Sequence, residues 1–311
     1  MTRITVIVVA AVFSLLAART PDPRVRAALD ALSPHTHDID DSTESGFYCP
    51  MDPDVRSPKA GHCVRCGMAL VRGAPDLVEY PLDLHIEPVV PRPADLTRLT
   101  FALTDPRTQQ SVHRFEVVHE KLYHAFVVSE DLSFFLHAHP ERSGDDDFHL
   151  DVRFPKPGMY RVLSDFYPAG GTPQLIANTV IIPGGAWDPK TANLQADLSP
   201  KRTENASVEL KVQSLNVAGA RTSLRFLLMP ADGLEPYLGT WGHLLTASAD
   251  LIDMVHGHPL SATDMRAGKE LEFNMAFPRP GVYRVWLQFQ RLGVVNTVAF
   301  NIPVDQGPTA K

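Results

Sequence analysis

Short apolar runs punctuated by Pro, Gly and Asp fill the chain from about residue 80 to residue 304. Runs of this length, rich in Val, Leu and Phe and closed by turn residues, predict β-strands. No sustained helical period interrupts them. We expect seven strands in each half of the region. They are 99–103, 113–118, 125–129, 134–139, 148–154, 159–166 and 175–182, and then 208–215, 223–229, 244–248, 253–258, 271–277, 282–290 and 294–302.

The two halves of this region repeat each other. Each contains His-x12-His-x-His-Pro with Ser-x-Asp-Leu inside it, at 124–140 and at 243–259. Matching blocks follow in the same order: Phe-Pro-x-Pro-Gly-x-Tyr-Arg-Val, and then Asn-Thr-Val at 178–180 and 296–298. Such blocks indicate a tandem duplication with a unit of about 100 residues. Seven short strands in a unit of this size favour an immunoglobulin-like β-sandwich, although a cupredoxin-like barrel or a jelly roll carries a similar pattern.

The fold class expected is therefore mainly β, with a small cysteine-containing module ahead of two tandem sandwiches. Boundaries are placed where the strand pattern gives way to polar or Pro-rich segments. The expected parts are a signal peptide 1–18, a linker 19–45, a cysteine module 46–73, a first sandwich 78–184, a linker 185–204 and a second sandwich 205–304.

Composition and the N-terminal segment narrow the class of protein. Hydrophobic residues make up 44% and charged residues 21%, which is ordinary for a soluble globular chain. The net charge of −7 argues against a nucleic-acid partner. Arg3 precedes an apolar run from Ile4 to Ala18, which is shorter than the roughly 20 residues that span a bilayer. This pattern predicts export to a periplasmic or other extracytoplasmic compartment, or an N-terminal membrane anchor if the run is not cleaved.

Histidines in the two repeats are spaced for metal binding. Residues i and i+2 of a strand point to the same face, so the rings of each His-x-His pair project side by side. The twelve preceding residues suit a hairpin that returns a third histidine opposite the pair. Three imidazoles with an open position suit Cu(II), Zn(II) or Ni(II), and common ligation requires donor nitrogens within about 4 Å of one another. The two triads are His124, His137 and His139, and His243, His256 and His258.

Other interpretations of these histidines stay open. A duplication also carries along residues that serve only structure. His113 and His119 occur in the first copy only, and we read them as ordinary residues rather than as an extension of the first triad. A metal-bound water at a three-histidine site can be hydrolytic, and Asp131 or Asp250 would then serve as the base.

All three cysteines of the chain fall within eighteen residues, as Cys49, Cys63 and Cys66. The Cys-x-x-Cys spacing brings two thiolates to one point, and soft sulfur donors gathered in this way suit Zn(II), Cu(I) or Ag(I). Met51 adds a thioether beside them, whereas Met68 fits better as core. A Cys63–Cys66 disulfide is the alternative in an exported protein.

This segment resembles the small heavy-metal-binding domain attached to copper- and silver-transporting ATPases and to periplasmic efflux adaptors. The residues that fit its pattern are Tyr48, Cys49, Pro50, Met51, Pro53, Gly61, Cys63, Cys66, Gly67, Met68 and Leu70. Asp52 stands where that family usually has His, which leaves the fourth ligand open. The resemblance implies metal resistance, or delivery of metal to a membrane transporter or efflux complex.

We therefore expect an exported heavy-metal-binding protein that handles a copper or zinc ion, with copper favoured. One alternative is a structural or interaction protein with a single structural zinc in the cysteine module. Another is a metal-dependent hydrolase or oxidase that uses the histidine triads. No nucleophile elbow, phosphate loop or dinucleotide fingerprint occurs in the sequence, so we expect no enzyme.

Overall fold

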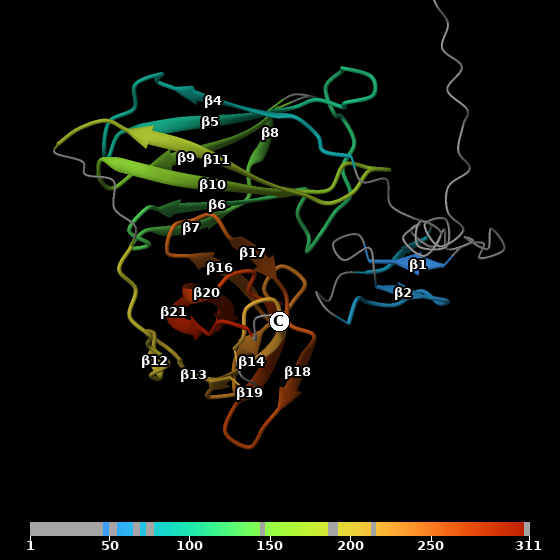
Figure 1. The fold of residues 1–311 in the computed structure, drawn as a ribbon, viewed down its shortest axis with the longest axis vertical. Coiled ribbons are helices and arrows are strands. Elements are labelled where there is room, and N and C mark those ends of the chain that lie inside the picture. Colours follow the sequence, from blue (N-terminus) through green and yellow to red (C-terminus); the bar gives the residue numbers. More distant parts are fainter. Residues whose placement is uncertain are drawn as a thin grey trace, which may run out of the picture. The chain divides into compact units, whose positions relative to one another are not determined.

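The computed structural model describes residues 46–49, 55–64, 69–72, 78–143, 147–185, 192–212 and 216–307. The regular elements of these ranges are all β-strands (Figure 1). No helix that could cross a membrane occurs in these ranges. The expected signal peptide 1–18 and linker 19–45 lie outside them.

The first repeat is a sandwich of two antiparallel sheets with the orders β4-β5-β9-β8 and β11-β10-β6-β7. Aromatic and aliphatic side chains such as Phe101, Tyr123 and Phe148 fill the space between the sheets. Its strands are β4 (Leu82–Glu87), β5 (Leu96–Leu103), β6 (Tyr123–Ser129), β7 (Phe135–Ala138), β8 (Glu141–Ser143), β9 (Asp147–Arg153), β10 (Gly158–Phe166) and β11 (Gln174–Ile182).

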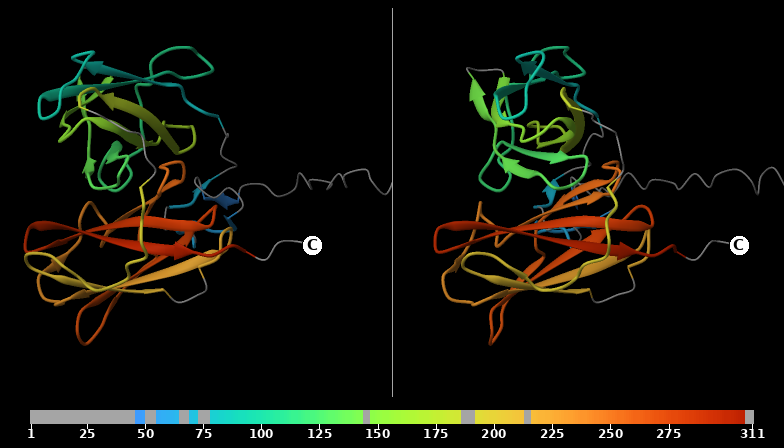
Figure 2. Two further views of the ribbon diagram at one scale, coloured as in Figure 1. Left: turned by 60° about the vertical axis from the view of Figure 1, so that its left-hand side comes forward. Right: turned by 90° about the vertical axis from the view of Figure 1, so that its left-hand side faces the viewer.

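The second repeat has the same two-layer plan (Figure 2). Its sheets have the orders β12-β13-β14-β19-β18 and β15-β20-β16-β17, with β21 also paired to β20. Phe226, Phe273 and Phe300 lie in its core. The strands are β12 (Lys201–Arg202), β13 (Ser207–Val212), β14 (Arg221–Met229), β15 (Leu234–Glu235), β16 (His243–Ser248), β17 (Met254–Gly257), β18 (Ser261–Asp264), β19 (Lys269–Ala276), β20 (Gly281–Arg291) and β21 (Val294–Val304).

Two expectations about the strands are wrong. Residues 113–118 form isolated bridges rather than a strand: Phe115 pairs with Pro168, which has no N–H to extend a ladder. The Asn-Thr-Val match is also out of register, because Tyr160 pairs with Val180 whereas Tyr283 pairs with Ile302. The short strands β4, β8, β12, β15 and β18 were not anticipated. Of these, β12 lies in the segment expected to be a linker.

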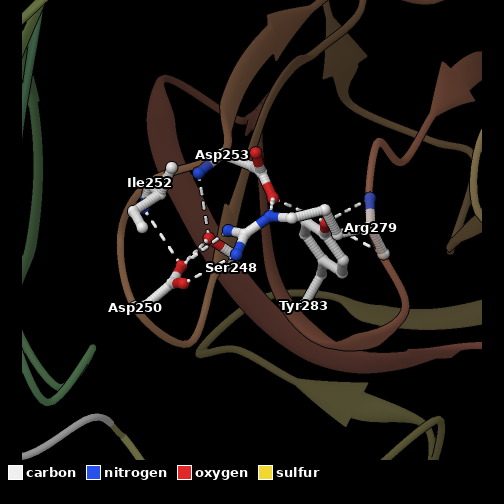
Figure 3. A network of polar contacts seen from close by, with 6 residues as sticks. All are labelled: Ser248, Asp250, Ile252, Asp253, Arg279 and Tyr283. Atoms are coloured by element: carbon white, nitrogen blue, oxygen red, sulfur yellow. Dashed lines mark hydrogen bonds and ion pairs between the residues drawn. The ribbon is translucent and has the colours of Figure 1, made fainter.

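The shared Ser-x-Asp-Leu sequence forms the turn of the β16–β17 hairpin (Figure 3). Ser248 Oγ donates a hydrogen bond to Asp250 Oδ1 at 2.6 Å and accepts one from the Asp253 N–H at 2.9 Å. Leu251 follows in the left-handed region with φ 55° and is buried. Arg279 donates to both aspartates. The first repeat makes the corresponding turn with Ser129, Asp131, Leu132 and, in place of the arginine, Lys156.

The shared Pro-Gly-x-Tyr sequence explains the start of β10 and β20. The Tyr160 hydroxyl donates to the Lys156 carbonyl oxygen at 2.9 Å, and the Tyr283 hydroxyl donates to the Arg279 carbonyl oxygen at 3.1 Å. A tyrosine that bonds backbone a few residues upstream is typical of immunoglobulin-like sandwiches. The two repeats thus adopt the fold class predicted from the sequence.

A third apolar cluster is shared by the two repeats. It combines the outer faces of β6 and β10 with those of β16 and β20, and the rings of Phe135 and Trp286 stack in it with centroids 4.9 Å apart. Every residue of β6 and β16 is consequently buried, because one face packs in a sandwich and the other in this cluster. Its buried members are Phe126, Val128, Leu132, Leu163, Leu245, Ala247, Leu251, Met254 and Trp286.

Candidate metal centre

The hairpins bring the histidines of each predicted triad together. Phe126 pairs with His137 in the first repeat and Leu245 pairs with His256 in the second, so each His-x-His pair lies across from the first histidine. The rings project from the face turned away from the sandwich core. One donor atom from each histidine can be chosen so that the three atoms of a triad lie within 4.8 Å of one another. Common ligation at 2.0–2.1 Å requires separations of about 4 Å or less. One pair in each triad meets this requirement: His124 Nδ1 and His137 Nε2 at 3.1 Å, and His243 Nδ1 and His258 Nε2 at 3.2 Å.

Backbone carbonyls fix the first histidine of each triad. His124 Nε2 lies 3.0 Å from the Val118 carbonyl oxygen, and His243 Nε2 lies 3.1 Å from that of Tyr237. A carbonyl oxygen only accepts, so the proton of each neutral ring belongs on Nε2. The Nδ1 atom of each ring is left with a lone pair that can bind a metal.

The central histidine of each triad is held by a side chain of the other repeat. His137 Nδ1 lies 2.8 Å from Gln288 Oε1, and His256 Nδ1 lies 2.6 Å from Asp165 Oδ2. Both oxygens are acceptors, so both histidines carry their proton on Nδ1. Their Nε2 atoms are therefore the free donors, and the hydrogen bonds fix the ring orientation as metal ligands require.

These proton positions leave lone pairs facing one another. His124 Nδ1 and His137 Nε2 are 3.1 Å apart, and neither carries a proton in the neutral rings. Among the described residues, the buried Nε2 atoms of His139 and His256 have no hydrogen-bond partner. Buried polar atoms are normally satisfied. One cation in each triad would satisfy the free ring nitrogens of that triad.

The two triads adjoin one another across the shared cluster. The ring centroids of His137 and His243 are 5.4 Å apart and those of His124 and His256 are 5.6 Å apart, close to the spacing within a triad. His119 was read as an ordinary residue of the first repeat. Its ring instead lies against His258 of the second triad, with centroids 3.6 Å apart.

Burial favours the neutral form of five of the six triad histidines, namely His124, His137, His139, His243 and His258. It lowers the pKa of His124 to about 4 and that of His139 to about 3, with the positive charge of Lys121 adding to the effect in both. Burial also lowers the pKa of His137, His243 and His258 well below the ordinary value. Neutral imidazole is the form that binds metal, so these rings are ready to bind at neutral pH.

Two residues that contact the triads are not indicated by the sequence motifs. Asp165 and Gln288 each stand five residues after the tyrosine of the shared Tyr-Arg-Val block, and they pair with His124 and His243 on the next strand. The two residues occupy equivalent positions, which comparison of the two repeat sequences shows. The sequence does not show their hydrogen bonds to the opposite repeat, because these bonds depend on how the two repeats pack.

Asp131 and Asp250 are poorly placed to act as bases. They lie in the hairpin turns, whereas His124 and His243 stand at the other ends of β6 and β16. Hydrogen bonding to Arg279 lowers the pKa of Asp250 to about 2. Both carboxylates stabilise turns in the structure.

The cysteine module is a three-stranded sheet of order β2-β1-β3, formed by β1 (Phe47–Tyr48), β2 (Arg56–Ser57) and β3 (Val71–Arg72). Cys49 and Cys63 are buried in a small core with Leu70, against which Phe47 and Val55 pack. The other expected ligands of this module, Cys66 and Met51, lie outside the described residues, as does Met68.

Several solved structures are distantly similar to the chain. A titin fragment, Titin-A168169, is 10% identical with a TM-score of 0.21, covering 74% of this chain and 99% of that one. InvD of Yersinia pseudotuberculosis is 12% identical with a TM-score of 0.23, covering 74% and 59%. The FN1–FN3 domains of chicken CNTN1 are 11% identical with a TM-score of 0.20, covering 76% and 70%. Scores this low carry no argument about function.

Family models match most of the chain. Residues 47–72 match the heavy metal binding domain, as the cysteine motif predicted. No curated protein matches the chain. One further family model matches the chain twice, at residues 79–183 and again at residues 201–306. The duplication seen in the sequence is therefore a duplication of one family domain. The chain belongs to the family described as Domain of unknown function (DUF8832), of which it carries two copies after a heavy metal binding domain.

Proposed function

We propose that this protein is an exported heavy-metal-binding protein that handles copper, either by sequestering it or by passing it to a membrane transporter or efflux complex. The thiolate module takes the soft ion, and the paired histidine triads hold further ions between the two sandwiches. The protein acts as a binding protein and not as an enzyme.

The observation that carries this proposal is the set of unprotonated nitrogens in the triads. His124 Nδ1 and His137 Nε2 face each other at 3.1 Å, and the buried Nε2 atoms of His139 and His256 find no partner among the described residues. A purely structural histidine cluster would be expected to share a proton at every close contact between its rings, as His258 Nε2 and His243 Nδ1 can at 3.2 Å. Nitrogen donors kept deprotonated at short range suit a transition-metal ion better.

The choice of copper rests on the two kinds of donor in one chain. Thiolates favour Cu(I), and imidazoles suit Cu(II) as well as Zn(II). The buried Cys49 and Cys63 stand within the match to the heavy metal binding domain. A protein that meets copper in both oxidation states would use both sets.

Export and delivery are supported by the sequence. Arg3 and the apolar run Ile4–Ala18 have the pattern of a signal peptide. The resemblance of the cysteine module to domains attached to metal-transporting ATPases and efflux adaptors points to a partner in metal transport. A net charge of −7 favours cations over nucleic acid.

Elemental analysis of the protein purified from the extracytoplasmic compartment of its own cells tests the proposal. We expect several copper ions per chain, fewer after Cys49, Cys63 and Cys66 are all changed to Ser. One zinc per chain, lost in that triple variant, would support the structural alternative instead. Turnover of a substrate that depends on added metal would contradict the assignment as a non-enzyme.

A further inference from the structure

Two equivalent positions in the repeats hold chemically different residues. Asp165 on β10 pairs with His124, and Gln288 on β20 pairs with His243, so the two side chains occupy the same place relative to their triads. One is a carboxylate and the other an amide. Because both repeats carry the same three histidines, this substitution gives the two triads partners of different charge.

Each of these side chains bonds to the central histidine of the other repeat. Asp165 Oδ2 accepts from His256 Nδ1 at 2.6 Å, and the His256 side chain is only 2% exposed. Gln288 Oε1 accepts from His137 Nδ1 at 2.8 Å. Gln288 Nε2 donates to Thr297 Oγ1 at 2.9 Å, and its oxygen faces the ring. Both contacts are therefore directed, and they differ in charge.

The difference matters because the partner of a ligating histidine tunes its metal. A carboxylate that accepts the Nδ1 proton makes Nε2 a stronger donor and places a negative charge beside the ion, whereas an amide supplies the orientation alone. Asp165 also lies next to His124, so its charge acts on both triads. Its hydrogen bond reaches only His256.

We propose that the two triads form an unequal pair, in which His243, His256 and His258 bind metal first and more tightly, and His124, His137 and His139 form a weaker, exchangeable site. Asp165 is the positioning residue that sets this order across the interface between the repeats. The proposal rests on the triads binding metal, as proposed above. It gives the protein one retaining site and one site from which an ion can be passed on.

Single-triad chains test this order. In a background with Cys49, Cys63 and Cys66 changed to Ser, His139→Ala leaves the second triad intact and His258→Ala leaves the first. Zn(II) affinity is measured for each full-length chain by competition with a chromophoric chelator. The second triad should bind about 10–100-fold more tightly, the range that a partner of a metal ligand typically contributes.

A second set of variants exchanges the carboxylate of Asp165 and the amide of Gln288. Asp165→Asn should weaken the second triad by about tenfold or more and the first by much less, and Gln288→Glu should strengthen the first. Both changes together should reverse the order of filling, which a merely structural role of either residue would not do. Asp83→Asn, at an exposed position of β4, is the matched control and should change neither affinity.

The outcomes separate the two proposals. Equal affinities in the single-triad chains, or an Asp165→Asn effect of the same size at both sites, would overturn the unequal pair and leave metal binding intact. Absence of Zn(II) and Cu(II) binding in both chains, with their folds retained by circular dichroism, would instead overturn the metal-binding role that the proposed function gives to the triads.

Discussion

The triad histidines differ in which ring nitrogen is left free. His124 and His243 donate hydrogen bonds from Nε2 to backbone carbonyls. His137 and His256 donate from Nδ1 to the side chains of Gln288 and Asp165. A strand spacing of i and i+2 predicts that rings share a face, but only their partners decide which nitrogen faces an ion. The donor set of each site therefore mixes Nδ1 and Nε2 atoms.

Nitrogen-15 NMR of the metal-free protein at neutral pH tests this assignment. His124 should appear as the Nε2–H tautomer and His137 as the Nδ1–H tautomer, because each bonds to an acceptor on that nitrogen. Added Zn(II) should shift Nδ1 of His124 and Nε2 of His137. His85, exposed on β4, should keep its shifts. The reverse tautomers would mean that the rings turn their protons toward the site and not away from it.

The lowered pKa of the buried histidines sets how stability depends on pH. The pKa of His124 is about 4 in the folded chain, against an ordinary value of 6.5. The unfolded chain therefore binds more protons between these values, and stability rises with pH there. Metal-free protein should keep full stability above about pH 6.5 and lose it as pH falls through about 4. Urea unfolding between pH 7.5 and 4 measures this, with His124→Gln expected to flatten the dependence.

The lowered pKa values also lower the pH at which protons displace a bound metal ion from the histidines. From the sequence alone, binding should weaken below about pH 6, where an exposed imidazole protonates. Burial lowers the pKa of His139 to about 3, so protonation should compete with the ion mainly nearer pH 4. A fall in bound Zn(II) already complete at pH 5.5 would show that the rings are less buried than the structure has them.

At the scale of elements, the hairpins explain what the sequence could predict. The twelve-residue spacing and the Ser-x-Asp-Leu turn were sufficient to place His124 opposite its His-x-His pair. The strand 113–118 failed because its apolar alternation is not matched by a ladder: His119 and Glu120 turn the chain at positive φ. The bonds of Asp165 and Gln288 could not be foreseen, since they join strands of different repeats.

The hairpin turn offers a test at this scale. Ser248→Ala removes a hydroxyl that bonds both Asp250 and the Asp253 N–H. The unfolding free energy should fall by about 1–3 kcal/mol, because a partly buried N–H and a carboxylate lose their shared partner. Guanidinium denaturation measures the loss. Ser261→Ala, at an exposed position of β18, should change stability by less than about 0.5 kcal/mol. If both changes altered the unfolding free energy equally, the hydrogen bonds of Ser248 would not be what stabilises the turn.

At the scale of the whole molecule, the two sandwiches are coupled by the cluster that they share. Each repeat has a core of its own, which the strand pattern predicted. The double burial of β6 and β16 shows in the sequence as apolar runs without alternation, yet a run of that kind does not say what covers its second face. Here the cover is the other repeat, and ring nitrogens of the histidine triads bond to the opposite repeat at that same interface.

Trp286→Ala tests this coupling. The side chain is 4% exposed and stacks on Phe135 of the other repeat. Its loss should cost about 3–5 kcal/mol of stability. Zn(II) affinity should fall at both triads, because the bonds of Gln288 and Asp165 cross the loosened interface. Val295→Ala, at an exposed site on β21, should leave both quantities unchanged. Loss of stability with unaltered Zn(II) binding would show that the triads do not depend on the interface.

The most direct test is the number of ions that the histidines hold. In the full chain with Cys49, Cys63 and Cys66 changed to Ser, equilibrium dialysis against Cu(II) or Zn(II) followed by elemental analysis should give two ions per chain. His139→Gln or His258→Gln should each reduce the number to one, and the two changes together should abolish binding. Retention of both ions in the double variant, or binding of none by the parent chain, would contradict a metal centre built from the two triads.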